Sequence, residues 1–214
     1  MQQWGALDMN RPIRVLLDVN IWVSNVIAAD RGYNGTANQS LVSMVSNNRW
    51  GLGDKSQLIV SFEMINRLET VLRRRDVEPD RVRAYCESIV DFMRYGPEAL
   101  DPYLILGGAE RFPMADTEDA GVLATAFGGH ADLIVTDNLQ DFVTKDAEVV
   151  DTQVISTVAS GSRTLQALRY SVADTNLIIA HPFDVLNWMR LGFDFSPDNL
   201  WDLIHDQTAK PKVS

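Results

Sequence analysis

The amino-acid sequence predicts an α/β fold of three layers, in which helices cover both faces of a central parallel sheet. Apolar segments of strand length alternate along the chain with segments whose apolar residues recur at helical spacing. This alternation is typical of parallel sheets. The chain has 214 residues, of which 46% are hydrophobic, and this is enough to bury the core of one such domain.

Each expected element follows from a local pattern. Strands are expected where short apolar runs are bounded by polar or turn residues, and helices where apolar residues recur every three or four positions. Ser61 is a natural N-cap, and Pro79 ends the helix before it. The expected strands are residues 13–17, 58–60 and 132–136, and the expected helices are residues 20–29, 40–45, 62–75, 80–94 and 120–127.

The pattern is less regular beyond residue 143. Residues 143–175, rich in Ser, Thr and Gly, are predicted to be an insertion that contains a hairpin, followed by a strand at 176–180. His181-Pro182 and Ser196-Pro197 each place a proline after a capping residue, which is a helix start signal. The predicted organisation is therefore one main domain at 11–180 and a short C-terminal helical tail at 181–214.

Composition narrows the classes of protein to consider. The single cysteine, Cys86, excludes an internal disulfide. No apolar run approaches the roughly 20 residues of a membrane-spanning helix, and the N-terminus lacks the charged-then-apolar layout of a secretory signal. We therefore expect a cytoplasmic protein with no membrane partner.

The net charge of −10 argues against a general nucleic-acid binder, because surplus carboxylate repels phosphate. Two features weaken this objection. Several acids fall in tight clusters where a divalent cation would neutralise them, and six arginines gather within residues 67–83. The alternative for these arginines is an ordinary solvated helix face.

Acidic side chains stand where predicted strands end and helices begin. Asp18 ends the first strand, residues 116–119 open a helix, and Asp137 and Asp141 follow the third strand. Ligands of parallel sheets bind beyond the carboxyl ends of the strands, so these acids are expected to converge. Magnesium prefers oxygen ligands and commonly takes one or two direct carboxylates. The pattern predicts a Mg²⁺ or Mn²⁺ site for phosphodiester hydrolysis.

Each acid also has a simpler structural interpretation. Asp18 is placed to cap the helix that starts near Asn20, and the spacing of Asp116 and Asp119 is like that of a capping box. The acids after the third strand are compatible with turn and cap positions. The three histidines show no metal-ligand spacing and are expected to pack or to lie at the surface.

Three segments resemble the motifs of PIN domains. Residues 15–24 resemble the opening strand and helix, residues 119–126 look like the helix that bears an acid, and residues 134–142 are similar to the final acidic motif. Residues 178–201 look like the helical tail of one subgroup. The resemblance implies a PIN-like fold and Mg²⁺- or Mn²⁺-dependent cleavage of RNA, often as the toxin of a VapC-type toxin-antitoxin pair.

The resemblance also implies roles for particular residues. Acids are expected to bind metal and to act in catalysis, and nearby polar side chains are expected to support them or to contact RNA. The implied metal ligands are Asp18, Asp119, Asp141 and Asp116, the further catalytic residues are Glu63 and Asp137, and the substrate contacts are Asn20, Arg67, Thr136 and Asn138.

One position departs from the PIN pattern. Such domains usually carry a glutamate directly before the leucine of a Leu-x-x-Val-Leu run, whereas here Arg67 precedes Leu68. Glu63 lies four residues earlier and shares that helix face. Either Glu63 substitutes, or Arg67 contacts phosphate, or the site is catalytically impaired.

The leading hypothesis is an endoribonuclease held in check by a cognate antitoxin protein. A phosphatase of the aspartyl-phosphate type is the second enzyme hypothesis, although Asn20 stands where that class has its second aspartate. A catalytically impaired PIN-like RNA- or protein-binding module is the alternative from another class. A homodimer stays open, since dimerisation would let two arginine-rich helices flank one substrate.

Overall fold

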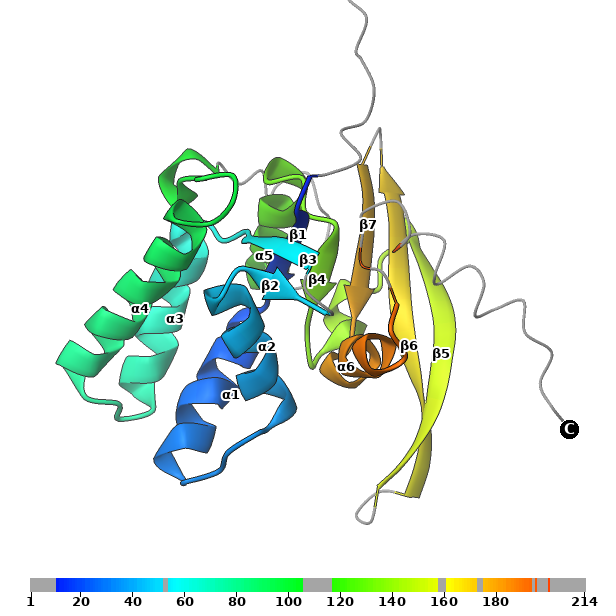
Figure 1. The fold of residues 1–214 in the computed structure, drawn as a ribbon, viewed down its shortest axis with the longest axis horizontal. Helices are drawn as coiled ribbons and strands as arrows, with labels where there is room; N and C mark the ends of the chain where they lie inside the picture. Colours follow the sequence, from blue (N-terminus) through cyan, green and yellow to red (C-terminus); the bar gives the residue numbers. More distant parts are fainter. Residues whose placement is uncertain are drawn as a thin grey trace, which may run out of the picture.

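The computed structural model describes residues 11–51, 54–105, 117–157, 161–172, 175–193, 195 and 200. In this part of the chain, helices flank a single seven-stranded sheet of order β2-β3-β1-β4-β7-β6-β5 (Figure 1). The strands are β1 Ile13–Leu17, β2 Arg49–Trp50, β3 Asp54–Leu58, β4 Leu133–Val135, β5 Ala147–Thr157, β6 Gly161–Val172 and β7 Thr175–Ala180. The helices are α1 Val19–Asp30, α2 Ala37–Ser46, α3 Phe62–Arg74, α4 Pro79–Arg94, α5 Thr117–Gly128 and α6 Pro182–Arg190, with short 3-10 turns η1 Pro102–Leu104 and η3 Leu139–Phe142. The predicted three-layer α/β/α class is confirmed.

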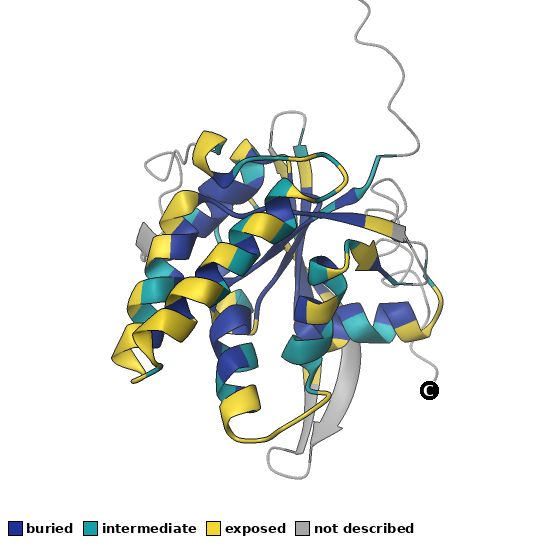
Figure 2. Ribbon diagram, turned by 60° about the vertical axis from the view of Figure 1, so that its left-hand side comes forward, coloured by how far each residue is buried: buried dark blue, intermediate teal, exposed yellow. Residues whose placement is uncertain are grey.

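The centre of the sheet is parallel. Strands β3, β1, β4 and β7 lie side by side, and Leu17 pairs with Val135, which in turn pairs with Ala180. These strands therefore end at one edge of the sheet. Every residue of β1 except Arg14 is buried, as a strand covered on both faces requires. Figure 2 shows the buried strands at the centre and the exposed sides of the helices facing outward.

The second predicted strand was placed too late. Strand β3 begins at Asp54 and ends at Leu58, and β2, which the sequence pattern did not predict, pairs antiparallel with it. Ser56 and Gln57 are buried within β3, where the Gln57 amide donates to the carbonyl oxygens of Leu58 and Met93 at 2.9 and 3.0 Å. A strand whose buried residues are polar contains no apolar run, because long-range hydrogen bonds satisfy these residues. The pattern of apolar residues therefore did not predict β3 at its true position.

The region 143–175 contains the predicted hairpin. Strands β5 and β6 pair antiparallel, with a register shift between Asp151 and Gln153, and β6 pairs antiparallel with β7. The hairpin therefore continues the central sheet, and it reaches well past the parallel strands in Figure 1. Its status as an insertion stays a prediction.

The first helix of the predicted C-terminal tail is α6. His181 is its N-cap and accepts a hydrogen bond from the Phe183 N–H. Trp188 is 1% exposed and belongs to the same hydrophobic core as the sheet, and α6 contacts α2. The second predicted tail helix, from Ser196, lies almost wholly outside the described residues. None of the helices in the described segments has the length and apolar content to cross a membrane.

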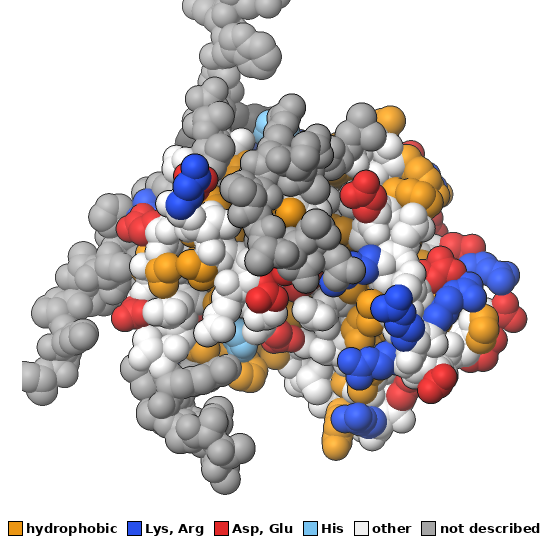
Figure 3. Space-filling model, turned by 180° about the vertical axis from the view of Figure 1, so that it is seen from behind, with side chains coloured by type: hydrophobic (Ala, Val, Ile, Leu, Met, Phe, Trp, Pro, Cys, Tyr) orange, Lys and Arg blue, Asp and Glu red, His pale blue; other side chains and the backbone are white. Residues whose placement is uncertain are grey.

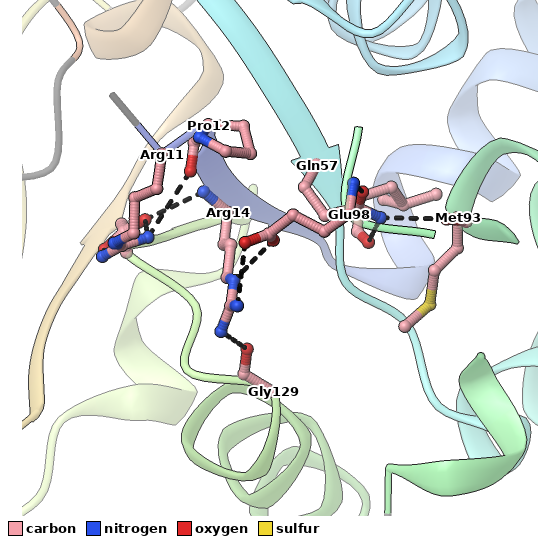
Figure 4. A network of polar contacts seen from close by, with 9 residues as sticks. Arg11, Pro12, Arg14, Gln57, Met93, Glu98 and Gly129 are labelled. Carbon is pink, nitrogen blue, oxygen red and sulfur yellow. Dashed lines mark hydrogen bonds and ion pairs between the residues drawn. The ribbon is translucent and has the colours of Figure 1, made fainter. Parts of the chain in front are cut away.

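A polar network holds the opposite, amino-terminal end of β1 (Figure 4). Arg14 donates to both carboxylate oxygens of Glu98, at 2.7 and 2.9 Å, and to the carbonyl oxygen of Gly129 at 3.2 Å. Arg11 pairs with Asp132 at 2.8 Å. These ionic residues tie β1 to the segments after α4 and α5, so their role is structural.

Candidate active site

Asp18 lies where the parallel strands end. It directly follows β1, and its backbone N–H donates to the carbonyl oxygen of Val135 in β4 at 3.0 Å. Asp18 occupies the N-cap position of α1, but its side chain makes none of the usual capping hydrogen bonds. The simple capping interpretation therefore does not account for this carboxylate.

A short chain of hydrogen bonds orients the Asp18 carboxylate. The Thr136 hydroxyl donates to Asp18 Oδ2 at 2.8 Å, and the Asn20 amide donates to the same oxygen at 3.3 Å. The Thr136 oxygen in turn accepts the Asn138 N–H at 3.1 Å. Thr136 is fully buried, so its hydroxyl positions Asp18 and the loop after β4, whereas Asn20 is exposed beside them.

Burial dominates the electrostatics of this carboxylate. Asp18 is 4% exposed, and loss of solvent raises its pKa above the ordinary value. The Thr136 hydrogen bond, the Val19 N–H and the positive charge of Arg67 oppose this rise. A buried acid with a perturbed pKa at the end of a parallel strand is typical of a functional site.

Helices α3 and α5 are locked together beside this strand end. The Thr125 hydroxyl of α5 donates to the Ser61 hydroxyl at 2.9 Å, and Ser61 caps α3 by accepting the Met64 N–H at 3.3 Å. Asp119, in the first turns of α5, is half-buried, with its Oδ2 atom shielded from solvent. Asp116 lies outside the described residues.

A groove of about 500 Å³ runs between α3 and α5. Its walls include Glu63, Arg67 and Arg74 from α3 and Gly121 and Val122 from α5. A side-chain carbon added at Gly121 would meet no atom within 4 Å, so the groove is open above this turn of α5. Glu63 and Arg67 therefore line the same groove. Gly121 and Val122, which line it from α5, come shortly after Asp119 on that helix.

Five of the six arginines in residues 67–83 fall into two groups. Arg73 pairs with Glu69 at 2.6 Å and Arg83 with Asp80 at 3.5 Å on the surface. Arg81 forms a similar surface ion pair with Asp30. The solvated-face alternative is therefore the better interpretation for these three, and Arg67 and Arg74 are the arginines of the stretch that line the groove.

The acids after β4 are held by other contacts. Asp137 accepts a hydrogen bond from the Asn38 amide at 3.1 Å and lies 3.7 Å from His181 Nε2. The Asn138 amide donates to Asp141 in η3, and both residues are exposed. His181, expected only to pack or to lie at the surface, is thus brought to the loop that carries these acids. The signal was its place directly after β7, whose last residue pairs with the end of β4.

The described side chains do not form the expected three-acid cluster. Within the segments that the structure describes, no three Asp, Glu, His or Cys side chains are grouped so that they could hold a metal ion. Asp18, Thr136 and Asn20 come together, whereas the roles of Asp119, Asp141 and Asp116 as ligands stay predictions. The oxygen donors around Asp18 fit one hydrated Mg²⁺ or Mn²⁺ ion held by one or two carboxylates.

The single cysteine, Cys86, does not fit the role of a catalytic nucleophile. Cys86 lies on α4 and is buried, and burial raises the pKa of its thiol to about 11. The reactive form of cysteine is the thiolate. Cys86 therefore stays protonated at neutral pH and acts as a core residue.

Comparison with known proteins identifies one family. Residues 14–140 match the family model of the PIN domain, which is more than half of the chain. No curated protein and no solved structure gives a significant match. PIN domains are typically nucleases, and they usually use divalent metal ions.

Proposed function

Because the chain belongs to the PIN domain family, we propose that it is a metal-dependent endoribonuclease whose reacting centre lies at the carboxyl ends of β1 and β4. The observation that carries the proposal is Asp18, buried at the end of a central parallel strand and oriented by Thr136 from the adjacent strand. A buried carboxylate lowers the stability of the fold, and a bound metal ion would balance its negative charge and employ it in catalysis.

The residues around Asp18 have separable roles in this proposal. A bound Mg²⁺ or Mn²⁺ supplies polarisation of the phosphate and a more acidic attacking water. Asp18 would be its direct ligand, Asp119 and Asp141 are proposed as further carboxylates that would act through its waters, and Asn20 would orient the substrate or a water. Thr136 positions Asp18 through the 2.8 Å hydrogen bond. Asp116 completes the acidic group if it follows the family pattern.

Other predicted residues support the loop after β4 and the groove. The Asn138 backbone N–H donates to Thr136 and its side-chain amide donates to Asp141, so Asn138 couples these two residues. The Asn138 side chain is exposed, and its amide oxygen is proposed to contact the substrate. Asp137 is proposed as an outer carboxylate that Asn38 and His181 hold in place. Glu63 is proposed to reach the centre from the groove.

The groove between α3 and α5 is the proposed path of the RNA strand. Arg67 and Arg74 line it, and arginine pairs with phosphate through a planar fork of donors. Figure 3 shows Lys and Arg side chains, with Asp and Glu side chains among them, on the side of the molecule that α3 and α4 form. We propose that the two arginines of the groove, rather than this mixed surface as a whole, bind phosphate despite the net charge of −10.

The finer biological assignment is a VapC-type toxin whose antitoxin covers the acidic centre. The motif resemblance at residues 15–24 and 134–142 supports it. Expression of the wild-type chain in a bacterial host is then expected to stop growth, and expression of Asp18→Asn is not. Growth arrest by both forms would reject the toxin assignment. The homodimer is a separate prediction, and light scattering on the purified chain would measure its mass.

Cleavage of RNA in the presence of manganese tests the enzyme proposal. Wild-type protein is expected to cleave, EDTA is expected to stop cleavage, and Asp18→Asn or Asp119→Asn is expected to lower the rate at least 100-fold, as loss of a principal electrostatic group does. Asp91→Asn, an exposed acid on α4, is the matched control and should keep the wild-type rate. Cleavage that persists in EDTA would reject the metal mechanism.

The second candidate is a catalytically impaired PIN-like module that binds RNA or protein. Arg67 at the position of the family glutamate favours it, together with the absence of a three-acid group among the described side chains. Filter binding with labelled RNA separates the two functions. Tight binding without cleavage, in manganese and by folded protein, would select the binding module.

A further inference from the structure

A pocket of about 250 Å³ lies where α1, the loop after it and the start of α2 meet. Its walls include Ser24 of α1, Arg31 and Tyr33 of the loop, and Asn38 of α2. It shares no residue with the α3–α5 groove. Figure 1 shows α1 and α2 side by side, joined by this loop. The volume is below the roughly 300–1,000 Å³ of sites that hold drug-sized ligands, so the pocket suits a smaller ring system.

Two routes place this α1–α2 pocket close to Asp18. Asn20 donates to Asp18 at 3.3 Å, and Ser24 lies four residues further along α1 on the same helix face. Ser24 is thus about 9 Å of helix beyond Asp18. From the other side, the Asn38 amide donates to Asp137 at 3.1 Å, in the loop after β4, whose end accepts the Asp18 N–H. A ligand in the pocket would therefore lie beside the proposed reacting centre.

The loop between the two helices holds Tyr33 at this pocket. The Tyr33 N–H donates to the carbonyl oxygen of Ala28 in α1 at 2.9 Å. The side-chain amide of Gln39 in α2 donates to the Tyr33 carbonyl oxygen at 2.7 Å, and Gln39 also forms a capping box with Thr36. Both helices therefore fix the backbone of Tyr33, whereas its side chain is 59% exposed. An exposed aromatic ring on a fixed backbone is suited to stack on a nucleobase.

The other groups of the pocket match the remaining parts of a nucleotide. Arg31 is exposed at the end of α1, and Asp30 beside it is paired with Arg81. A guanidinium binds two phosphate oxygens at once. The Asn38 amide gives one N–H to Asp137, which leaves its second N–H and its oxygen for a ligand. Donors and acceptors beside an aromatic ring are the groups that recognise the edges of an unpaired RNA base.

We propose that the α1–α2 pocket binds one unpaired base of the RNA, close to the scissile phosphate. Tyr33 stacks on the base, Ser24 and Asn38 contact its edges, and Arg31 binds a flanking phosphate. The base must be free of its complement to enter, so the substrate is single-stranded RNA. This inference rests on the proposed function, since it names the form of RNA that the same centre takes.

Binding of labelled single-stranded RNAs of A, C or U to the full-length chain, measured by fluorescence anisotropy in EDTA, tests the proposal. Tyr33→Ala should weaken binding at least about fivefold, as loss of one base–aromatic stack does. Tyr33→Phe keeps the ring and should stay within about twofold of wild type. Tyr95→Ala is the matched control, because Tyr95 is 79% exposed at the end of α4, and it should also stay within about twofold.

Two further measurements test the polar contacts. Arg31→Gln should lower the slope of log affinity against log salt concentration by about 0.7, the value for one phosphate contact on a single strand. The wild-type chain should distinguish the three RNAs, and Asn38→Ala should bring their affinities closer together, because a base edge is then no longer contacted. A duplex of the A and U strands should bind more weakly than either single strand.

Several results would overturn the base pocket. Wild-type affinity in Tyr33→Ala would do so, as would equal losses in Tyr33→Ala and Tyr95→Ala, which would mean that exposed aromatic rings bind RNA without a pocket. Duplex RNA bound as tightly as the single strands would also overturn it. Circular dichroism checks that each variant is folded. If Tyr33→Ala does not fold, Tyr33→Leu decides, and affinity equal to wild type would reject the stacking role.

RNA cleavage in manganese, measured on the same preparations, separates this inference from the proposed function. Binding that depends on Tyr33 without cleavage of any RNA would reject the nuclease and keep the base pocket. Cleavage by wild type and Tyr33→Ala at the same rate, with equal affinity, would keep the nuclease and reject the pocket. A wild-type chain that neither binds nor cleaves RNA would overturn both.

Discussion

Replacing Thr136 with valine removes one hydroxyl at the centre of the site and little volume. The hydroxyl donates to Asp18 at 2.8 Å and accepts the Asn138 N–H at 3.1 Å, and Thr136 is fully buried. A hydrogen bond to a charged group contributes about 1.5–3 kcal/mol, and a donor left without its acceptor adds to the cost. We expect Thr136→Val to lower the free energy of unfolding by about 2 kcal/mol at neutral pH, measured by urea denaturation.

The same substitution should change how the site responds to pH. The Thr136 hydrogen bond lowers the pKa of Asp18, so its loss raises that pKa further. Activity that needs the ionised carboxylate should then be lost at a higher pH on the acid side, and the acid limb of the pH–rate profile should shift upward. The loss of stability should be smaller in acid, where the protonated carboxyl no longer presents a charged acceptor.

A serine at this position provides the control. Thr136→Ser keeps the hydroxyl and loses one methyl group, so it should retain the pH–rate profile and lose about 1 kcal/mol of stability. If Thr136→Val keeps both the urea midpoint and the acid limb of the wild type, the hydroxyl does not position Asp18 and the reasoning is wrong.

Three further predictions concern stability. Burial raises the pKa of Asp18 above its ordinary value of 3.8, so the folded chain binds the proton of this carboxyl more tightly than the unfolded chain does. The folded state therefore loses stability as the pH rises from 3.8 through the raised pKa and the carboxyl ionises. Asp18→Asn should therefore raise Tm at neutral pH but not in strong acid, and a Tm gain that does not depend on pH would contradict this. Glu98→Ala leaves Arg14 without its bidentate partner and should cost about 2 kcal/mol in urea denaturation; an unchanged midpoint would show that the pair is fully solvated. Gly129→Ala would set a side-chain carbon 2.5 Å from Ile59 and should cost about 1–3 kcal/mol by the same measurement, whereas wild-type stability would mean that α5 shifts freely.

Local patterns were sufficient for most of the secondary structure. Helical spacing and caps depend on neighbours a few residues apart, and Ser61 does cap α3 by accepting the Met64 N–H. Asp18 could be placed at a strand end for the same reason, because the apolar run of β1 stops directly before it. Strand β3 was misplaced, since its buried polar residues take partners from distant segments.

The sequence by itself determined the three-layer class and the position of Asp18, because both follow from short-range alternation of strands and helices. Only the tertiary structure decided which side chains meet Asp18. Thr136 reaches it across 118 positions of sequence through the pairing of β1 with β4, and His181 meets Asp137 through the pairing of β4 with β7. Packing of α3 against α5 likewise directed Arg67 into the groove while Arg73 stayed in a surface ion pair. Helix periodicity separates these two arginines onto different faces, but long-range contacts choose the face that is covered.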